Sequence, residues 1–158
     1  RGTIPIQGVP FKFRNPGDKK PSPNVCRIAP GDRVSFWGSF HGHEACPRRV
    51  WFLGACEKPP TRGCLEVEVP YVTGPNRIDR KTKTTFEHGR HFGAYASVEK
   101  LSEGRVAWRG ATKTLCDAAL YLWHLDTPPE HAQHRLDAMP IRNTMDVPMV
   151  ILGITEEY

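Results

Sequence analysis

Short stretches of alternating apolar and polar residues, separated by glycine and proline, run through most of the chain. The clearest is the segment 64–69, in which Leu65, Val67 and Val69 alternate with glutamates. This period of two predicts a strand with one buried side and one side facing solvent. We expect the strand to end at Pro70, because proline has no N–H to donate to a sheet ladder.

A less regular form of the same pattern predicts further strands. We expect them at residues 10–14, 25–28, 33–37, 50–53, 92–98, 105–108 and 147–154. Residues 73–91 are polar and predict a long, mobile loop. The apolar run 118–125 fits either a central strand or a buried helix, because periodicity does not separate the two over so short a length.

Two segments carry the signals of a helix start. Residues 127–130, Thr-Pro-Pro-Glu, have the form of a capping box with proline at the first helical position, and they predict a helix to about Ala138 that stops at Pro140. Residues 114–117, Thr-Leu-Cys-Asp, resemble a capping box less closely.

Composition points to a single folded domain. The 158 residues include 15 prolines and 14 glycines, which favour many turns between short strands. We predict a mainly β fold, an antiparallel β-sandwich or jelly-roll-like domain with one or two short helices. Residues 1–24 are expected to form an extended arm that wraps the domain or reaches a neighbour, and residues 25–158 one β-rich domain. No apolar run approaches the roughly 20 residues that span a bilayer, so we expect no membrane partner.

The chain is basic, with a net charge of +5 and an isoelectric point near 9.1. Such a protein attracts polyanions, so RNA or another polyanion is the expected partner. The candidate contacts are the cations of the polar segment, namely Arg77, Arg80, Lys81, Lys83 and Arg90. Further candidates are Lys19, Lys20, Arg48 and Arg49, with Trp37, Trp51 and Trp108 for base stacking. The alternative is a solvated loop, with the tryptophans in the core.

The cysteine count bears on the compartment. Five cysteines leave at least one thiol unpaired, which favours a reducing environment over a disulfide scaffold. The sequence also has no N-x-S/T glycosylation acceptor, so we expect an intracellular or virion location. The first residue is Arg1 rather than methionine, as expected if the chain was processed from a precursor or the sequence begins partway along one.

Histidine and cysteine gather in one region, at His41, His43, Cys46 and Cys56. Zinc favours imidazole and thiolate ligands in sets of four, so these residues are candidates for a structural zinc site. No C-x-x-C pair is present, and the alternative is buried cysteines beside surface histidines. Apart from this zinc, no cofactor is expected.

A second candidate chemistry is a cysteine nucleophile. Cys116 would lie in the first turn of the weaker predicted helix, a position that favours the reactive thiolate. His91, at the start of an expected strand, would be its base, as in papain-like hydrolases and acyltransferases. The segment 30–34 also resembles the strand opening of permuted NlpC-like hydrolases, in which histidine precedes cysteine. The chain departs from that family because no Asn-Cys-Glu stands at Cys116, and an inert structural cysteine is the alternative.

The segment 65–74, Leu-Glu-Val-Glu-Val-Pro-Tyr-Val-Thr-Gly, resembles the strand before a large loop in the jelly-roll capsid proteins of small RNA viruses. That resemblance implies a jelly-roll fold and a role in assembly. We therefore predict a non-enzymatic binding or assembly module with a basic face, a viral structural or RNA-binding protein that self-associates or binds a protein partner. The alternatives are the cysteine hydrolase and a zinc-stabilised interaction domain.

Overall fold

Two antiparallel sheets and a separate hairpin make up the structure, a computed structural model that describes residues 2–13, 25–36, 46–72 and 78–158. The strands are β1 (Gly2–Ile6), β2 (Val9–Phe13), β3 (Cys26–Ile28), β4 (Arg33–Phe36), β5 (Arg49–Cys56), β6 (Leu65–Val72), β7 (Ile78–Phe86), β8 (Arg105–Gly110), β9 (Ala118–Asp126), β10 (Arg135–Leu136), β11 (Met139–Asn143) and β12 (Met149–Glu157). A single 3-10 turn, η1 (Pro129–His131), is the helical element of the described residues. Within those ranges, no helix has the length and hydropathy to cross a membrane.

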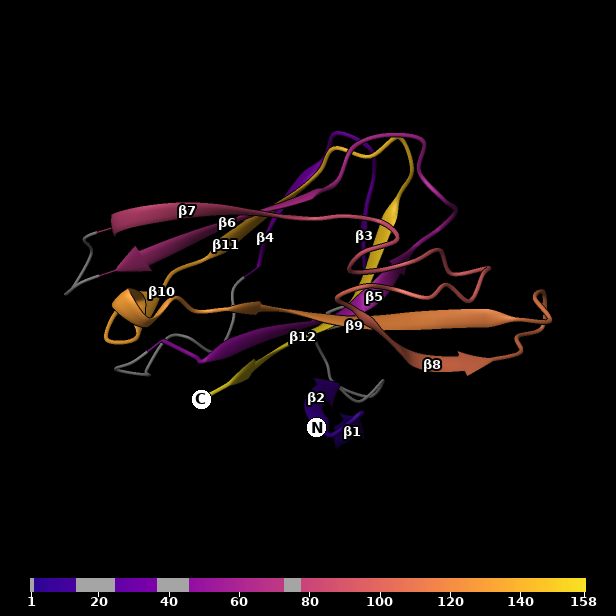
Figure 1. The fold of residues 1–158 in the computed structure, drawn as a ribbon, viewed down its shortest axis with the longest axis horizontal. Coiled ribbons are helices and arrows are strands. Elements are labelled where there is room, and N and C mark those ends of the chain that lie inside the picture. Colours follow the sequence, from indigo (N-terminus) through magenta and orange to yellow (C-terminus); the bar gives the residue numbers. More distant parts are fainter. Residues whose placement is uncertain (1, 14–24, 37–45, 73–77) are drawn as a thin grey trace, which may run out of the picture.

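The chain distributes its strands between the two sheets in the order of a jelly roll. In one sheet, called here the β6 sheet, β7, β6, β11 and β4 lie side by side, and the short β10 continues β11 along β6. In the other, the β5 sheet, the order is β3, β12, β5, β9 and β8. From β3 to β12 the chain changes sheet at every connection except the β6–β7 and β8–β9 hairpins and the short β10–β11 joint. The predicted antiparallel β-sandwich is confirmed, and its two layers are visible in Figure 1.

The main core lies between the sheets and uses the inward side of each strand. On β6, Leu65, Val67 and Val69 are at most 1% exposed, as their alternation predicted. On the facing β5 sheet, the rings of Phe52 and Trp123 stack with centroids 5.7 Å apart. Such an aromatic pair contributes about 0.5–1.5 kcal/mol beyond the burial of its area.

Most of the strands expected from sequence are present. The predictions at 10–14, 25–28, 33–37, 50–53, 105–108 and 147–154 correspond to β2, β3, β4, β5, β8 and β12. The ambiguous run 118–125 is the strand β9 rather than a helix, because it pairs with both β5 and β8.

The predicted strand end at Pro70 is wrong, and so is the predicted loop at 73–91 over residues 78–86. Strand β6 continues to Val72, and the Pro70 carbonyl accepts a 3.1 Å hydrogen bond from the Asp137 N–H at the joint between β10 and β11. Over residues 78–86 the expected loop is strand β7, which pairs with β6 along its whole length. Its alternating threonines suit a pleated sheet, and cross-strand glutamates on β6 face its lysines.

The segment 92–98, expected as a strand, is a folded loop. Phe92 and Ala94 make only isolated bridges, although both are fully buried. The carboxylate of Glu99 accepts hydrogen bonds from the Ala94 N–H (2.9 Å) and the Ser97 hydroxyl (2.8 Å). These local bonds take the place of a strand ladder.

The helix predicted from Thr127 is also wrong. The Thr127 hydroxyl donates a hydrogen bond to the carbonyl of Pro47 instead of capping a helix, and only the η1 turn forms. Leu136 is 5% exposed and belongs to β10, which pairs with β6. Pairing with β6 and burial of this leucine therefore outweigh the local helix signal.

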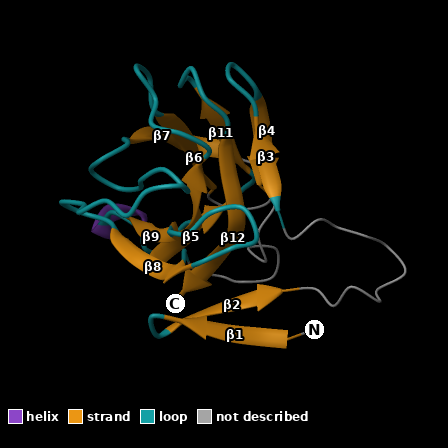
Figure 2. Ribbon diagram, turned by 90° about the vertical axis from the view of Figure 1, so that its right-hand side faces the viewer, coloured by secondary structure: helices purple, strands orange, loops and turns teal. Residues whose placement is uncertain are grey.

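The described part of the expected N-terminal arm is the β1–β2 hairpin, a separate two-stranded sheet that lies beyond the β5 sheet (Figure 2). Its two-residue turn has positive φ at Gln7 (53°) and Gly8 (82°), the geometry of a type I′ turn. This turn places Pro5 opposite Pro10. In such a hairpin the pair next to the turn is hydrogen-bonded and the following pair, here Pro5 and Pro10, is not. Any other residue at these two positions would point its N–H away from the partner strand, toward the free edge of the hairpin. Because proline has none, both free edges of the hairpin are poor templates for another strand.

Candidate functional site

The outward side of the β5 sheet is apolar, although it faces away from the main core. Trp51 and Leu53 on β5 and Leu122 on β9 are 8%, 2% and 1% exposed, respectively. They form a second apolar cluster with Val9 and Phe11 of the hairpin. An antiparallel sheet commonly leaves one side to solvent, so this second apolar side requires a covering element.

The hairpin provides part of that covering through side-chain contacts. The Phe11 ring lies against Gly153, where a Cβ atom would stand 2.7 Å from the ring carbon Cδ1. The Thr155 hydroxyl donates a 2.9 Å hydrogen bond to the Pro10 carbonyl beside it. The hairpin forms its own two-stranded sheet, so these side chains rather than a strand ladder attach it to the domain.

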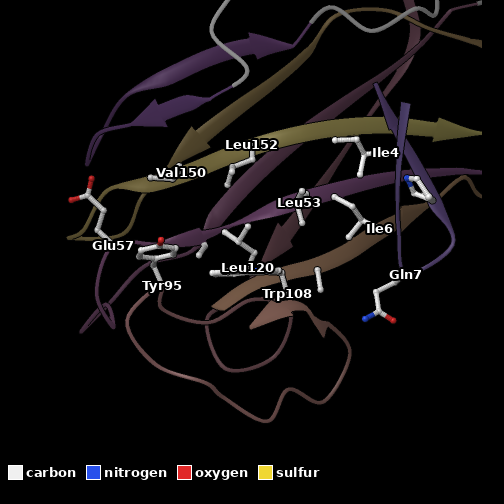
Figure 3. A pocket seen from close by; sticks show the side chains of 13 residues that line it. Ile4, Ile6, Gln7, Leu53, Glu57, Tyr95, Trp108, Leu120, Val150 and Leu152 are labelled. Carbon is white, nitrogen blue, oxygen red and sulfur yellow. The ribbon is translucent and has the colours of Figure 1, made fainter. Parts of the chain in front are cut away.

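Strand β2 covers only part of the apolar side, and a groove of about 800 Å³ remains beneath β1 (Figure 3). The floor of the groove is formed by Leu53, Leu120, Val150 and Leu152. Ile4 and Ile6 of β1 line the hairpin side, and Trp108 of β8 lines the groove as well. Ile4 is 53% exposed and Trp108 is 41% exposed, so two large apolar side chains lie open to solvent at the groove.

Polar groups of the groove are found at its ends (Figure 3). At one end, Glu57 forms an ion pair with Arg27, with 2.5 Å between Oε1 and Nε. This hydrogen-bonded guanidinium lowers the pKa of Glu57, which is therefore ionised at neutral pH. At the other end, the Gln7 carbonyl accepts a hydrogen bond from Arg105. The long apolar floor between these ends is suited to binding apolar side chains.

The five predicted polyanion contacts do not form one surface. Lys81 and Lys83 share the outward side of β7 and pair with Glu68 (3.2 Å) and Glu66 (3.0 Å), whereas strand alternation places Arg80 on the other side.

Arg90 lies in the loop after β7 and is held by Glu103 (2.7 Å from Nε) and by Glu87 (3.8 Å from Nη1). Arg77 lies outside the described residues, as do Lys19 and Lys20.

The predicted stacking tryptophans are not beside these lysines. Trp51 and Trp108 belong to strands of the β5 sheet, whereas Lys81 and Lys83 face outward from the β6 sheet. Trp51 lies under the hairpin, with the guanidinium of Arg105 5.3 Å from its ring centroid. Trp37 lies outside the described residues.

The structure does not provide the local geometry expected for the Cys116 nucleophile. No helix begins at residue 114; instead, the hydroxyl of Thr112 accepts hydrogen bonds from the following N–H groups in a tight turn before β9. His91 Nδ1 accepts a 3.0 Å hydrogen bond from the Glu87 N–H, and its Nε2 lies 3.1 Å from a Glu103 carboxylate oxygen. Both ring nitrogens are thus engaged, and burial lowers the pKa of this histidine.

The candidate zinc ligands are only partly described. His41 and His43 lie outside the described residues, while Cys46 and Cys56 are buried in the main core. Burial raises the pKa of the Cys46 thiol to about 11 and that of Cys56 to about 12, and the Cys56 thiol donates to the Gly93 carbonyl. Among the described residues, no group of three or more histidine, cysteine or acidic side chains is arranged to hold a metal. Zinc binding stays a prediction.

Sequence reasoning missed the groove, although one signal was present. The runs 50–53 and 118–125 are apolar at consecutive positions, which indicates strands covered on both sides. The covering element, an N-terminal hairpin far away in sequence, is not marked by any spacing in those runs. Comparison of the chain with protein-family models, with curated proteins and with solved structures gave no match.

Proposed function

We propose that the chain is a non-enzymatic assembly module, a jelly-roll subunit that associates with copies of itself through the groove under its hairpin. The observation that carries this proposal is the incomplete covering of the apolar side of the β5 sheet. The jelly-roll strand order and the capsid-like segment on β6 suit a shell subunit. Because unrelated functions share this fold, the argument rests on the groove and not on the topology.

The two outward sides of the sandwich differ in chemistry. The β6 sheet presents charged side chains such as Glu66 and Lys83, as expected for a solvated surface. The β5 sheet presents leucines and tryptophans, with Ile4 and Trp108 exposed beside the apolar groove. A contiguous apolar surface bordered by polar groups is typical of an interaction site.

A second copy of the chain is the partner that this surface fits best. The hairpin already shows complementarity to the β5 sheet, through Val9 and Phe11. Its proline-blocked edges disfavour the addition of a foreign strand, so association is expected through side chains in the groove. Exposed Ile4 and Trp108 lie at the same groove, so two copies that meet here about a twofold axis would each bury both side chains.

The test is the oligomeric state of the full chain, measured by sedimentation velocity over a wide concentration range. We expect reversible self-association in the wild type. Ile4→Ser with Trp108→Ser should raise the dissociation constant roughly tenfold or more, because burying one such side chain is worth about 1.5–3 kcal/mol.

The matched control is Val25→Ser with Val98→Ser, which removes two apolar side chains that are 46% and 36% exposed but do not line the groove. This variant should associate as the wild type does. A wild type that is monomeric at every concentration, or equal losses in the two variants, would contradict the proposal. Circular dichroism of each variant establishes that it is folded.

A further inference from the structure

The outward side of the β6 sheet carries more cations than carboxylates among its described side chains. Four strands contribute outward-facing charged residues in adjacent cross-strand rows, defined here as the basic face: Arg33 on β4, Arg142 on β11, Glu66 and Glu68 on β6, and Lys81 and Lys83 on β7. Among the side chains that the structure describes on these strands, four cations against two carboxylates leave an excess of two positive charges. Of these four cations, only Lys81 and Lys83 were predicted as polyanion contacts from sequence, because Arg33 and Arg142 are far apart in the chain and meet only through the pairing of β4 with β11.

The two carboxylates of the basic face leave its cations largely exposed to solvent. Lys81, Lys83 and Arg33 are 55%, 60% and 57% exposed, and the Arg33–Glu68 distance is 3.9 Å. Exposed pairs of this kind contribute roughly 0–1 kcal/mol each, so a stronger anion can displace the carboxylates. Arg142 is exposed and, within the described part of the chain, forms no ion pair.

The spacing of the cations suits a charged polymer. Neighbouring strands lie about 4.8 Å apart, and alternate residues of one strand about 6.5–7 Å apart, so the face is a shallow grid of charge and not a pocket for one ion. The outward residues between the charges include Ser35, Thr85 and Pro140. Of the described outward residues on these strands, none is aromatic, so the face offers phosphate contacts without base stacking.

We propose that the basic face binds the phosphate backbone of RNA, without preference for base sequence. The inference rests on charge complementarity between the cations of the basic face and phosphate groups. It does not depend on the proposed self-association, because the basic face lies on the β6 sheet and the groove on the β5 sheet. Positive charge on this surface is consistent with the net charge of +5 of the whole chain. The absence of stacking groups from the described outward residues predicts that poly(U) and poly(A) bind equally well.

The experiment measures the affinity of the full chain for labelled single-stranded poly(U) as a function of salt. We expect Lys81→Ser, Lys83→Ser and Arg142→Ser together to lower the affinity at low salt by at least about tenfold. The slope of log K against log salt should become shallower by about two, because each phosphate contact on a single strand contributes roughly 0.7 to that slope and the variant removes three cations.

A matched control removes the same net charge elsewhere, at the exposed residues Lys58, Lys100 and Lys113, all changed to Ser. It should keep most of the affinity and of the slope. In the opposite direction, Glu66→Gln with Glu68→Gln frees both lysines and should tighten binding severalfold.

Three results would overturn the proposal. The first is an equal loss in the two triple variants, which would show an effect of net charge alone. The second is a preference between poly(U) and poly(A) of more than about tenfold, which would require base contacts that this face does not offer. The third is binding of heparin but not of RNA. Sedimentation of the same variants separates this test from self-association, which should be unchanged in all of them.

Discussion

Asn143 offers a sharp test of how the fold is held together, because one buried side chain joins three segments. The residue is 0% exposed at the end of β11. Its Nδ2 donates to the carbonyls of Ile28 (2.9 Å) and Val147 (2.8 Å), and its Oδ1 accepts from the Met145 N–H (3.0 Å). The side chain thus connects β3, β11 and the turn before β12.

The substitution Asn143→Asp keeps the shape and removes the donor. An ionised carboxylate would face two carbonyl oxygens, which would both lose the Nδ2 donor, and it would bury a charge without a cationic partner. Each unsatisfied buried group costs about 1–3 kcal/mol, and an uncompensated buried charge about 3–5 kcal/mol. We therefore expect the free energy of unfolding to fall by about 3–5 kcal/mol at neutral pH, a large part of the roughly 5–15 kcal/mol typical of a domain.

The loss should depend on pH. Burial disfavours the charged form, so the pKa of the introduced carboxyl group in the folded variant is expected above the value of about 3.9 in the unfolded chain. The folded state then binds more protons than the unfolded state above that pH. Stability of the variant relative to wild type falls as pH rises, by about 1.4 kcal/mol per unit, until the folded pKa is passed. The protonated acid can still donate one hydrogen bond, which makes the variant least damaged at low pH.

Urea unfolding followed by tryptophan fluorescence measures this effect in wild type, Asn143→Asp and Asn143→Leu at about pH 4.5 and pH 7.5. The wild type corrects for every other titrating group, and the leucine variant should lose stability by the same amount at both pH values. The difference between the aspartate variant and wild type should grow by roughly 2 kcal/mol or more between the two conditions. A difference that does not change with pH, or a loss below about 1 kcal/mol at neutral pH, would refute the reasoning.

Two further predictions concern the backbone and a buried histidine. Gly63 and Gly31 both have φ of 83°, but a Cβ at Gly63 would collide with the backbone of Thr144, whereas one at Gly31 meets nothing within 4 Å. Gly63→Ala should therefore cost roughly 3 kcal/mol and Gly31→Ala only about 1–2 kcal/mol in urea unfolding, and equal costs would count against the close approach. Burial lowers the pKa of His91, so the unfolded chain binds the extra proton and the wild type loses stability as pH falls below about 6.5. His91→Gln should lose less stability than wild type between about pH 7 and pH 5, and identical pH profiles would show that His91 does not contribute.

Local sequence determined where most strands lie and which side of them is buried. The alternation in segment 64–69 was sufficient for β6, because side chains of a strand point to opposite sides in turn and only one side can be apolar when the other meets water. The same reasoning failed at residues 78–86. The composition of that segment is polar and predicts a loop. It forms β7 because β6 pairs with it along its whole length and places carboxylates beside its lysines.

Local sequence also overestimated helix. The residues at Thr127 match a helix-capping pattern, but the Thr127 hydroxyl donates to the Pro47 carbonyl instead. Further along, the two residues of β10 pair with β6. A helix cap contributes about 1 kcal/mol, which is less than the burial of one leucine such as Leu136 together with a strand pairing.

The two surfaces proposed for binding were decided by the tertiary structure. The groove joins side chains from β1, β5, β8, β9 and β12, between Ile4 and Leu152 in sequence, and the basic face joins Arg33 to Arg142. The apolar runs on β5 and β9 determined only that both sides of those strands must be covered. Which segment covers them, and how much it leaves open, depends on contacts between residues far apart in the chain. Those contacts have no period that can be read along the sequence, since burial depends on which surfaces meet and not on the order in which the residues follow one another.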